Sequence, residues 1–234
     1  MESNFRTTVV AVLQHLYANP QRLEEKQPEM RKRLDLLCGK GQGLGNKASD
    51  HEACFAVVVG EFMFLPYQPG IDGYFYQYQA HGTQRSIDFR LLEVTDGKMV
   101  DFVDLDLKHG EKEGIFLNDG KFLDNVVYVV SFSRSVKLEG QKKKQREYVC
   151  LIARGQDIMT DKDRARLEER HALLRKLNDL NENGDFLVLY ARSANRYECK
   201  QFTPEFVENA MMTVGQWLLP SSPQTEQEPH SQSA

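Results

Sequence analysis

Residues 86 to 110, SIDFRLLEVTDGKMVDFVDLDLKHG, decide the fold, because they read as two strands joined by a tight turn at residues 95 to 98. Side chains alternate between the two faces of a strand. One face of the second strand carries Val103, Leu105 and Leu107. The other face carries Phe102, Asp104, Asp106 and Lys108. Acids and lysine are poor strand formers and are costly to bury unpaired, so this face needs compensation.

Asp88 interrupts the apolar pattern of the first strand in the same way. If the two strands pair across the turn, Asp88 and Asp106 approach each other. Carboxylates at close range repel, which raises at least one pKa unless a cation lies between them. Mg²⁺ prefers carboxylates and water, and Mn²⁺ can substitute for it. Lys108 would then lie beside the metal-bound water, where it can offset charge that develops during a reaction.

Ion pairing is the alternative explanation for each acid. The available partners are Arg85 or Arg90 for Asp88, and Lys98 or Lys108 for Asp104 and Asp106. Asp104 shares the face of Asp106 and can replace it as a metal ligand. His109 follows the lysine and points to the other face, where it is either a strand-end histidine or a general base.

The remaining chain predicts an α/β or α+β domain with a central mixed sheet flanked by helices. Helices are expected at residues 5–17, 21–38, 50–64, 164–180 and 204–219. Strands are expected at residues 74–79, 86–94, 100–109, 125–132, 147–153 and 185–192, those from 86 to 153 forming a meander. Ser49 and Glu52 have the spacing of a capping box, so Glu52 can simply cap the third helix.

These elements divide the chain into one domain and a tail. The domain spans residues 1–219, with N-terminal helices at 4–38, a core at about 46–153, and a helix–strand–helix unit at 164–219. Residues 220–234 are polar and are expected to be disordered.

Composition excludes several classes of protein. With 234 residues, of which 41% are hydrophobic, the chain can bury a core without disulfides. Its longest apolar stretch is about a dozen residues, short of the roughly 20 that span a bilayer. The four cysteines have no metal-ligand spacing and indicate a reducing, cytoplasmic compartment. A net charge of −4 leaves nucleic acid open as a partner, because residues 134–176 hold 13 Lys and Arg against 7 Asp and Glu.

Asp88, followed after a turn by Asp106-Leu107-Lys108, resembles the PD-(D/E)XK nuclease motif. In that superfamily an acid on one strand precedes an acid-x-lysine sequence on the next. Ile87 replaces the proline of the strict motif, and Asp replaces Glu before the lysine. A helix with an acid such as Glu52, directly before the sheet, is a further resemblance. Size, single-domain organisation and the continuation FLNDGKF…VVYVVSF look most like a type II restriction endonuclease, over roughly residues 46–134.

The resemblance implies a restriction-endonuclease-like core that cuts double-stranded DNA with Mg²⁺. Asp88, Asp106 and the Leu107 carbonyl would hold the ion, Lys108 would stabilise the transition state, and Glu52 would be a further catalytic group. Restriction enzymes that cut palindromes act as homodimers, in the cytoplasm of a prokaryotic cell. We expect the N-terminal helices to supply the dimer interface.

DNA contacts are expected from loops near the sheet edge and from a basic turn. Candidates for reading bases are Gln77, Gln79, Gln84, Arg85 and Asn118, within residues 77–85 and 109–121. Candidates for phosphate contacts are Arg134, Lys142, Lys143 and Lys144, which are equally suited to a solvated hairpin tip. Two rival functions stay open. One is a repair or junction nuclease with the same centre, and the other is a non-catalytic nucleic-acid-binding protein in which the acids and lysine form an ion-pair network.

Overall fold

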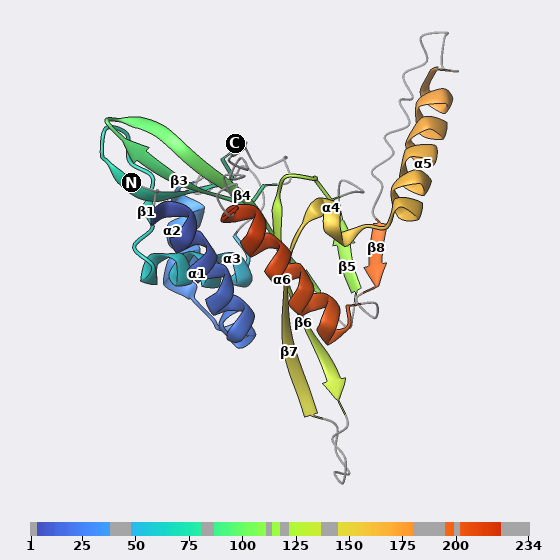
Figure 1. The fold of residues 1–234 in the computed structure, drawn as a ribbon, viewed down its shortest axis with the longest axis horizontal. Helices are drawn as coiled ribbons and strands as arrows, with labels where there is room; N and C mark the ends of the chain where they lie inside the picture. Colours follow the sequence, from blue (N-terminus) through green and yellow to red (C-terminus); the bar gives the residue numbers. More distant parts are fainter. Residues whose placement is uncertain are drawn as a thin grey trace, which may run out of the picture.

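A computed structural model describes residues 4–37, 48–80, 87–110, 114–117, 122–136, 145–179, 195–198 and 202–220. The fold is α+β, with a mixed six-stranded sheet flanked by helices, as the sequence predicts (Figure 1). The sheet has the order β1-β2-β3-β4-β6-β7. Its strands are β1 (Leu65–Pro66), β2 (Gly73–Tyr78), β3 (Phe89–Thr95), β4 (Lys98–Gly110), β6 (Val127–Val136) and β7 (Gln145–Arg154).

The β3–β4 hairpin forms where the sequence places it. Asp96 and Gly97 both have positive φ, 53° and 68°, which suits a two-residue turn between right-twisted strands. The carboxylate of Asp72 accepts hydrogen bonds from both of their backbone N–H groups, each at 3.0 Å. Phe89 is paired with Leu105, so Asp88 is next to the position of Asp106. The hairpin therefore brings the two acids to the same end of the sheet.

The predicted meander is wrong after β4. Strands β4 and β6 pair in parallel, with Asp106 beside Tyr128, so the chain must cross over between them. Strand β5 (Gly114–Leu117) lies in this connection and leaves the main sheet to pair with β8 (Asn195–Glu198). We expected no strand at either position, and each strand is four residues long. This parallel pair, together with the parallel pairing of β1 with β2, gives the sheet its mixed character.

Helices α1 (Asn4–Ala18) and α3 (Asp50–Glu61) cover one face of the sheet (Figure 1). The aliphatic face of β4, with Leu105 and Leu107, packs into this core. The predicted helix at 21–38 is instead a 3₁₀ turn (Pro20–Glu24) followed by α2 (Pro28–Leu37). Pro28 has no N–H and fits the first turn of a helix but not its interior, so a new helix begins there.

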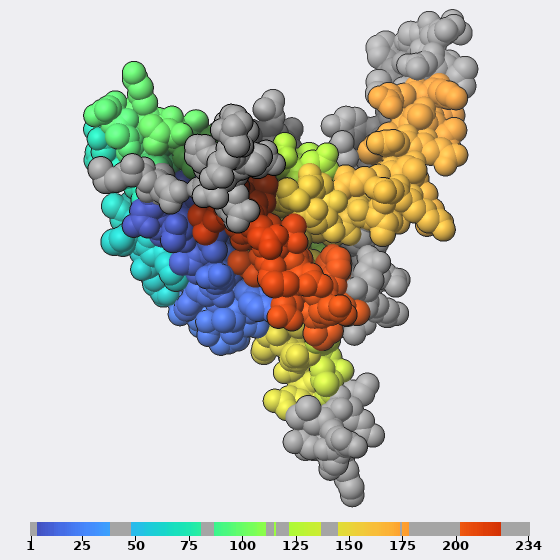
Figure 2. Space-filling model, viewed as in Figure 1, coloured from blue at the N-terminus to red at the C-terminus, as the bar shows by residue number. Residues whose placement is uncertain are grey.

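A second core lies on the other face of the sheet and includes Tyr128 and Val130. Helix α6 (Pro204–Leu218) contributes to both cores, Val207 to the second and Val214 to the first. Helix α4 (Gly155–Ile158) follows β7, and α5 (Asp161–Asp179) projects away from the body (Figures 1 and 2). The β6–β7 hairpin also extends beyond the body, which makes it accessible to a large partner.

Two predicted features fall outside the described residues: the strand at 185–192 and the tail from 221 onward. Within the described part of the chain, no helix has the length and apolar character needed to cross a membrane.

Candidate functional site

Asp88 is held by the backbone of β4. Its own N–H donates to the Leu105 carbonyl at 3.0 Å, and its Oδ2 accepts from the Leu107 N–H at 2.8 Å. The carboxylate of Asp88 is therefore fixed beside the peptide between Asp106 and Leu107. This contact between Asp88 and Leu107 follows from the antiparallel pairing of β3 with β4, which the sequence predicts.

Asp106 is the most unusual charged residue of the sheet, because its side chain is only 1% exposed. Its Oδ1 accepts from Lys108 Nζ at 2.8 Å. Its Oδ2 is buried and has no hydrogen-bond donor among the described residues. Burial raises the pKa of Asp106 well above its usual range, and the Lys108 ammonium opposes this rise. The charge of Asp88, and a side-chain hydrogen bond that the protonated Asp106 forms with it, add to the rise. Asp106 thus lies between one lysine and a second acid.

Asp104, the alternative ligand on the same strand, has a different environment. Arg90 binds it through two hydrogen bonds, Nε to Oδ1 at 2.6 Å and Nη2 to Oδ2 at 2.8 Å. Such a bidentate pair uses both carboxylate oxygens. The guanidinium of Arg90 also lies 4.2 Å from the centre of the Phe102 ring. Asp104 is thereby neutralised, whereas Asp106 retains an oxygen without a donor.

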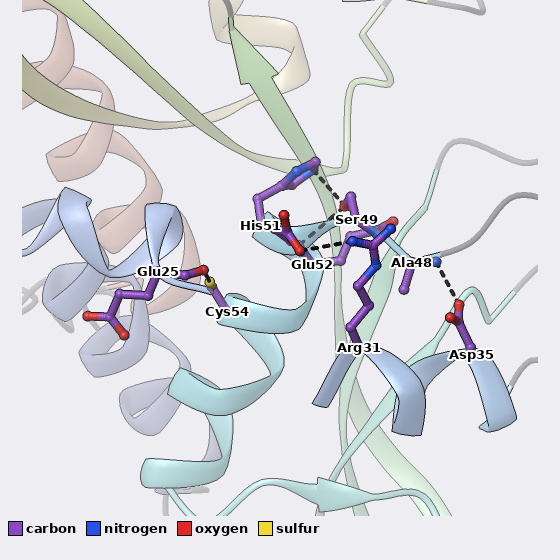
Figure 3. Close-up of polar contacts among 9 residues, drawn as sticks. Glu25, Arg31, Asp35, Ala48, Ser49, His51, Glu52 and Cys54 are labelled. Carbon is purple, nitrogen blue, oxygen red and sulfur yellow. Dashed lines mark hydrogen bonds and ion pairs between the residues drawn. The ribbon is translucent and has the colours of Figure 1, made fainter. Parts of the chain in front are cut away.

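Glu52 caps α3 and also belongs to the cluster of charged residues around Asp88 and Asp106. Its Oε2 accepts hydrogen bonds from Ser49 N at 2.5 Å and from Ser49 Oγ at 2.6 Å (Figure 3). The Glu52 N–H donates in return to Ser49 Oγ, which completes the capping box. Its carboxyl also hydrogen-bonds to the Tyr78 hydroxyl. Burial and the charge of Asp88 raise the pKa of Glu52, while Ser49 and Tyr78 lower it. The Glu52 carboxyl therefore faces Asp88 even while it caps α3.

His51 lies in the same cluster and was not expected from the sequence. Its pKa is lowered to about 4, chiefly by burial, and also by the positive charges of His109 and Lys108. Asp88 and a hydrogen bond to the Leu107 backbone oppose this shift. The ring stacks on the ring of His109, with the two centroids 5.8 Å apart. Figure 3 shows the His51 side chain beside Ser49 and Glu52 at the start of α3. Only its position at the start of a helix next to Glu52 marks His51 in the sequence.

The ring of His109, on the other side of this stack, has two polar neighbours. Its Nδ1 lies 3.1 Å from Ser131 Oγ and 3.4 Å from Glu24 Oε1. These contacts fix His109 between β6 and the 3₁₀ turn at Pro20–Glu24. The residue thus lies on the opposite face from Lys108, as the strand alternation predicts.

The expected DNA-contact residues are dispersed. Gln77 lies on β2 opposite Arg90, and Gln79 follows the end of that strand. Arg134, on β6, forms an ion pair with Glu147 at 2.5 Å. The remaining candidates, Gln84, Arg85, Asn118, Lys142, Lys143 and Lys144, lie outside the described residues.

The described residues contain no group of three or more His, Cys, Asp or Glu side chains arranged to hold a metal ion. The expected set is smaller, two carboxylates and the Leu107 carbonyl. The buried Oδ2 of Asp106, with no donor among the described residues, fits a hard cation, because such an ion takes oxygen ligands. The repulsion between Asp88 and Asp106 also fits a cation, because a positive charge between two carboxylates removes that repulsion.

Comparison with known proteins gives no further assignment: no protein-family model, no curated protein and no solved structure matches the chain.

Proposed function

We propose that this protein is a Mg²⁺-dependent endonuclease that hydrolyses phosphodiester bonds of double-stranded DNA at specific sites, in the manner of a type II restriction enzyme. The observation that carries the proposal is the environment of Asp106. A fully buried carboxylate with one oxygen lacking a donor among the described residues is held beside a second acid and a lysine. Burying such a group is unfavourable unless a partner compensates it.

Asp88, Asp106 and the Leu107 carbonyl are the groups that would hold the ion. When bound, Mg²⁺ would supply a polarised water and neutralise charge on the phosphate. Asp88 is prepared for this role because the Leu107 N–H fixes its Oδ2. The same interaction ties Asp88 to the N–H of Leu107. The carbonyl of Leu107, which also accepts a hydrogen bond from His51, would be the third ligand. Mn²⁺ can replace Mg²⁺ at an oxygen site of this kind.

Lys108 is the group that would act on the substrate. Its ammonium contacts Asp106 at 2.8 Å, and its side chain is 22% exposed, so it can reach a phosphate bound at the surface. There it would offset the negative charge that develops in the transition state. His51 stays neutral at physiological pH, because burial keeps its pKa near 4, so it adds no second cation to the site.

DNA would lie along the projecting β6–β7 hairpin (Figure 1). The outer ends of its two strands include Arg134 and Arg146. The turn that joins β6 to β7 includes Lys142 to Lys144 in the sequence, and these lysines would contact phosphates. A palindromic site is read by a homodimer, because symmetric half-sites call for a two-fold axis. Such an enzyme works in the cytoplasm of a prokaryotic cell.

A non-catalytic nucleic-acid-binding protein is the second candidate, and the Lys108–Asp106 ion pair favours it. In that case the pair is structural and no divalent ion is needed. Metal binding separates the two candidates, because the proposed nuclease binds Mg²⁺ or Mn²⁺ at micromolar to millimolar concentration, on the order expected for oxygen sites of this size.

The test is incubation of the purified protein with phage or plasmid DNA in Mg²⁺, Mn²⁺ or EDTA, followed by sequencing of the fragment ends. Discrete fragments with one end sequence support the proposal, and cleavage restricted to branched DNA would assign a junction nuclease instead. Asp106→Asn should abolish cutting. Asp101→Asn is the matched control on the same strand, because Asp101 pairs with Arg6 away from the site. No cleavage of any DNA with either metal contradicts the proposal.

A further inference from the structure

Gln79 is one of three non-glycine residues with positive φ in the described chain, at 52°. Left-handed backbone is unfavourable for a residue with a side chain, so the surrounding structure must hold it there. Its backbone N–H donates to the Asp88 carbonyl at 2.7 Å. Its side-chain Nε2 donates to the Tyr78 hydroxyl at 3.2 Å. Gln79 therefore contacts two neighbours of the proposed metal site at once.

The Tyr78 hydroxyl links Gln79 to Glu52. A hydroxyl has one proton to donate and two lone pairs that accept. Because it accepts from Gln79, its own proton is directed to the Glu52 carboxyl, with which it hydrogen-bonds. Tyr78 is 9% exposed, so water competes little for this bond. A chain of hydrogen bonds runs from Gln79 through Tyr78 to Glu52.

The helix cap does not require this chain. Ser49 alone completes the capping box. Its N–H and hydroxyl donate to Glu52 Oε2, and its hydroxyl oxygen accepts from the Glu52 N–H. Tyr78 belongs to β2, so its bond to Glu52 ties the start of α3 to the sheet. Asp88 and Glu52 repel each other; Ser49 holds the Glu52 carboxyl from the helix, and the Tyr78 hydroxyl stabilises its charge from the sheet.

We infer that Tyr78 and Gln79 are positioning residues that hold the Glu52 carboxyl beside Asp88, a proposed ligand of the divalent cation, so that they set cation affinity and do not read DNA bases. This inference rests on the proposed function, because it presupposes the metal site. The amide Oε1 of the half-buried Gln79 is itself buried and has no donor among the described residues, so this oxygen is not presented to a DNA groove. Partners of this kind typically change metal affinity about 10- to 100-fold when removed.

The experiment measures Mn²⁺ binding to the DNA-free protein, with the free ion followed by electron paramagnetic resonance. Tyr78→Phe removes only the hydroxyl and should weaken Mn²⁺ binding about tenfold. Gln79→Gly keeps the backbone N–H to Asp88 and tolerates positive φ, so it removes only the amide. It should weaken binding by a smaller factor. In the double variant, Gln79→Gly should weaken Mn²⁺ binding by less than about twofold beyond the effect of Tyr78→Phe, since both changes act through one hydroxyl.

Two matched controls isolate the chain. Met63→Gly relieves positive φ at a residue that is 75% exposed at the far end of α3. Tyr67→Phe removes a hydroxyl on the outer edge of the sheet, where the ring packs on Phe75. Both should bind Mn²⁺ like the parent. Thermal melts in EDTA verify that every variant is folded before binding is compared.

The outcomes separate this inference from the proposed function. If the parent binds Mn²⁺ and cleaves DNA while both site variants bind Mn²⁺ normally, the inference is overturned and the nuclease stands. If Gln79→Gly keeps Mn²⁺ affinity but loses DNA affinity or changes the cut sequence, Gln79 reads bases and the inference is again overturned. If the parent neither binds Mn²⁺ nor cuts DNA, the proposed function fails and the inference fails with it.

Discussion

His51 should make the metal-free protein sensitive to mild acid. The folded protein keeps the ring neutral down to about pH 4, whereas the unfolded chain protonates it near 6.5. Between these values the unfolded state binds the extra proton, so stability is fully present above about pH 6.5 and is lost as the pH falls toward 4. The groups that face the ring are Asp88, Lys108 and His109.

The magnitude follows from the size of the pKa shift. Each pKa unit corresponds to about 1.4 kcal/mol, so the shift from 6.5 to about 4 removes about 2 to 3 kcal/mol of unfolding free energy between pH 7.5 and pH 4.5. That is a large part of the stability of an ordinary domain, which lies near 5 to 15 kcal/mol.

His51→Phe isolates this contribution, because phenylalanine keeps an aromatic ring beside His109 and cannot titrate. At pH 7.5 the variant should be less stable by about 1 kcal/mol, since it loses the hydrogen bond to the Leu107 backbone. At pH 4.5 it should be more stable than the parent. Urea unfolding of both proteins in EDTA, at several pH values and constant ionic strength, measures the difference. Parallel pH profiles for the two proteins would refute the reasoning.

Three further predictions concern the acids and the lysines. Lys108→Ala should reduce cleavage by more than about a hundredfold in single-turnover assays while DNA binding in Ca²⁺ stays within about threefold, because the ammonium is assigned to the transition state; cleavage within tenfold of the parent would remove that assignment. Burial raises the pKa of Asp106, so the native state prefers the protonated form, and the metal-free protein loses stability as the pH rises above the usual carboxyl range. Asp106→Asn should therefore raise the melting temperature in EDTA more at pH 8 than at pH 5, and an equal change at both pH values would count against a strained carboxylate. Replacing Lys142, Lys143 and Lys144 by Gln should flatten the slope of log affinity against log salt by up to about 0.9 per lost phosphate contact and leave the cut sequence unchanged; an unaltered slope in fluorescence-anisotropy titrations would make this turn a solvated loop.

The sequence by itself determined the central hairpin and its two faces. Alternation in β4 separates Leu105 and Leu107 from Asp106 and Lys108, and the turn at Asp96-Gly97 makes the strands antiparallel neighbours. Local signals of this kind depend only on residues close in the chain, which is why they can be read without a structure. The capping box of Ser49 and Glu52 belongs to the same class.

Tertiary structure alone decided which acid keeps a buried oxygen without a donor among the described residues. Arg90 and Asp104 are 14 positions apart and meet because the strand register aligns them, and that register takes Asp104 out of the site while Asp106 stays in it. The parallel pairing of β4 with β6 and the stack of His51 on His109 depend on the packing of α3 and on a crossover, and neither has a local signature. Burial then raises the pKa of Asp106 and lowers that of His51, because desolvation is a property of the folded surroundings and is not encoded in any one residue.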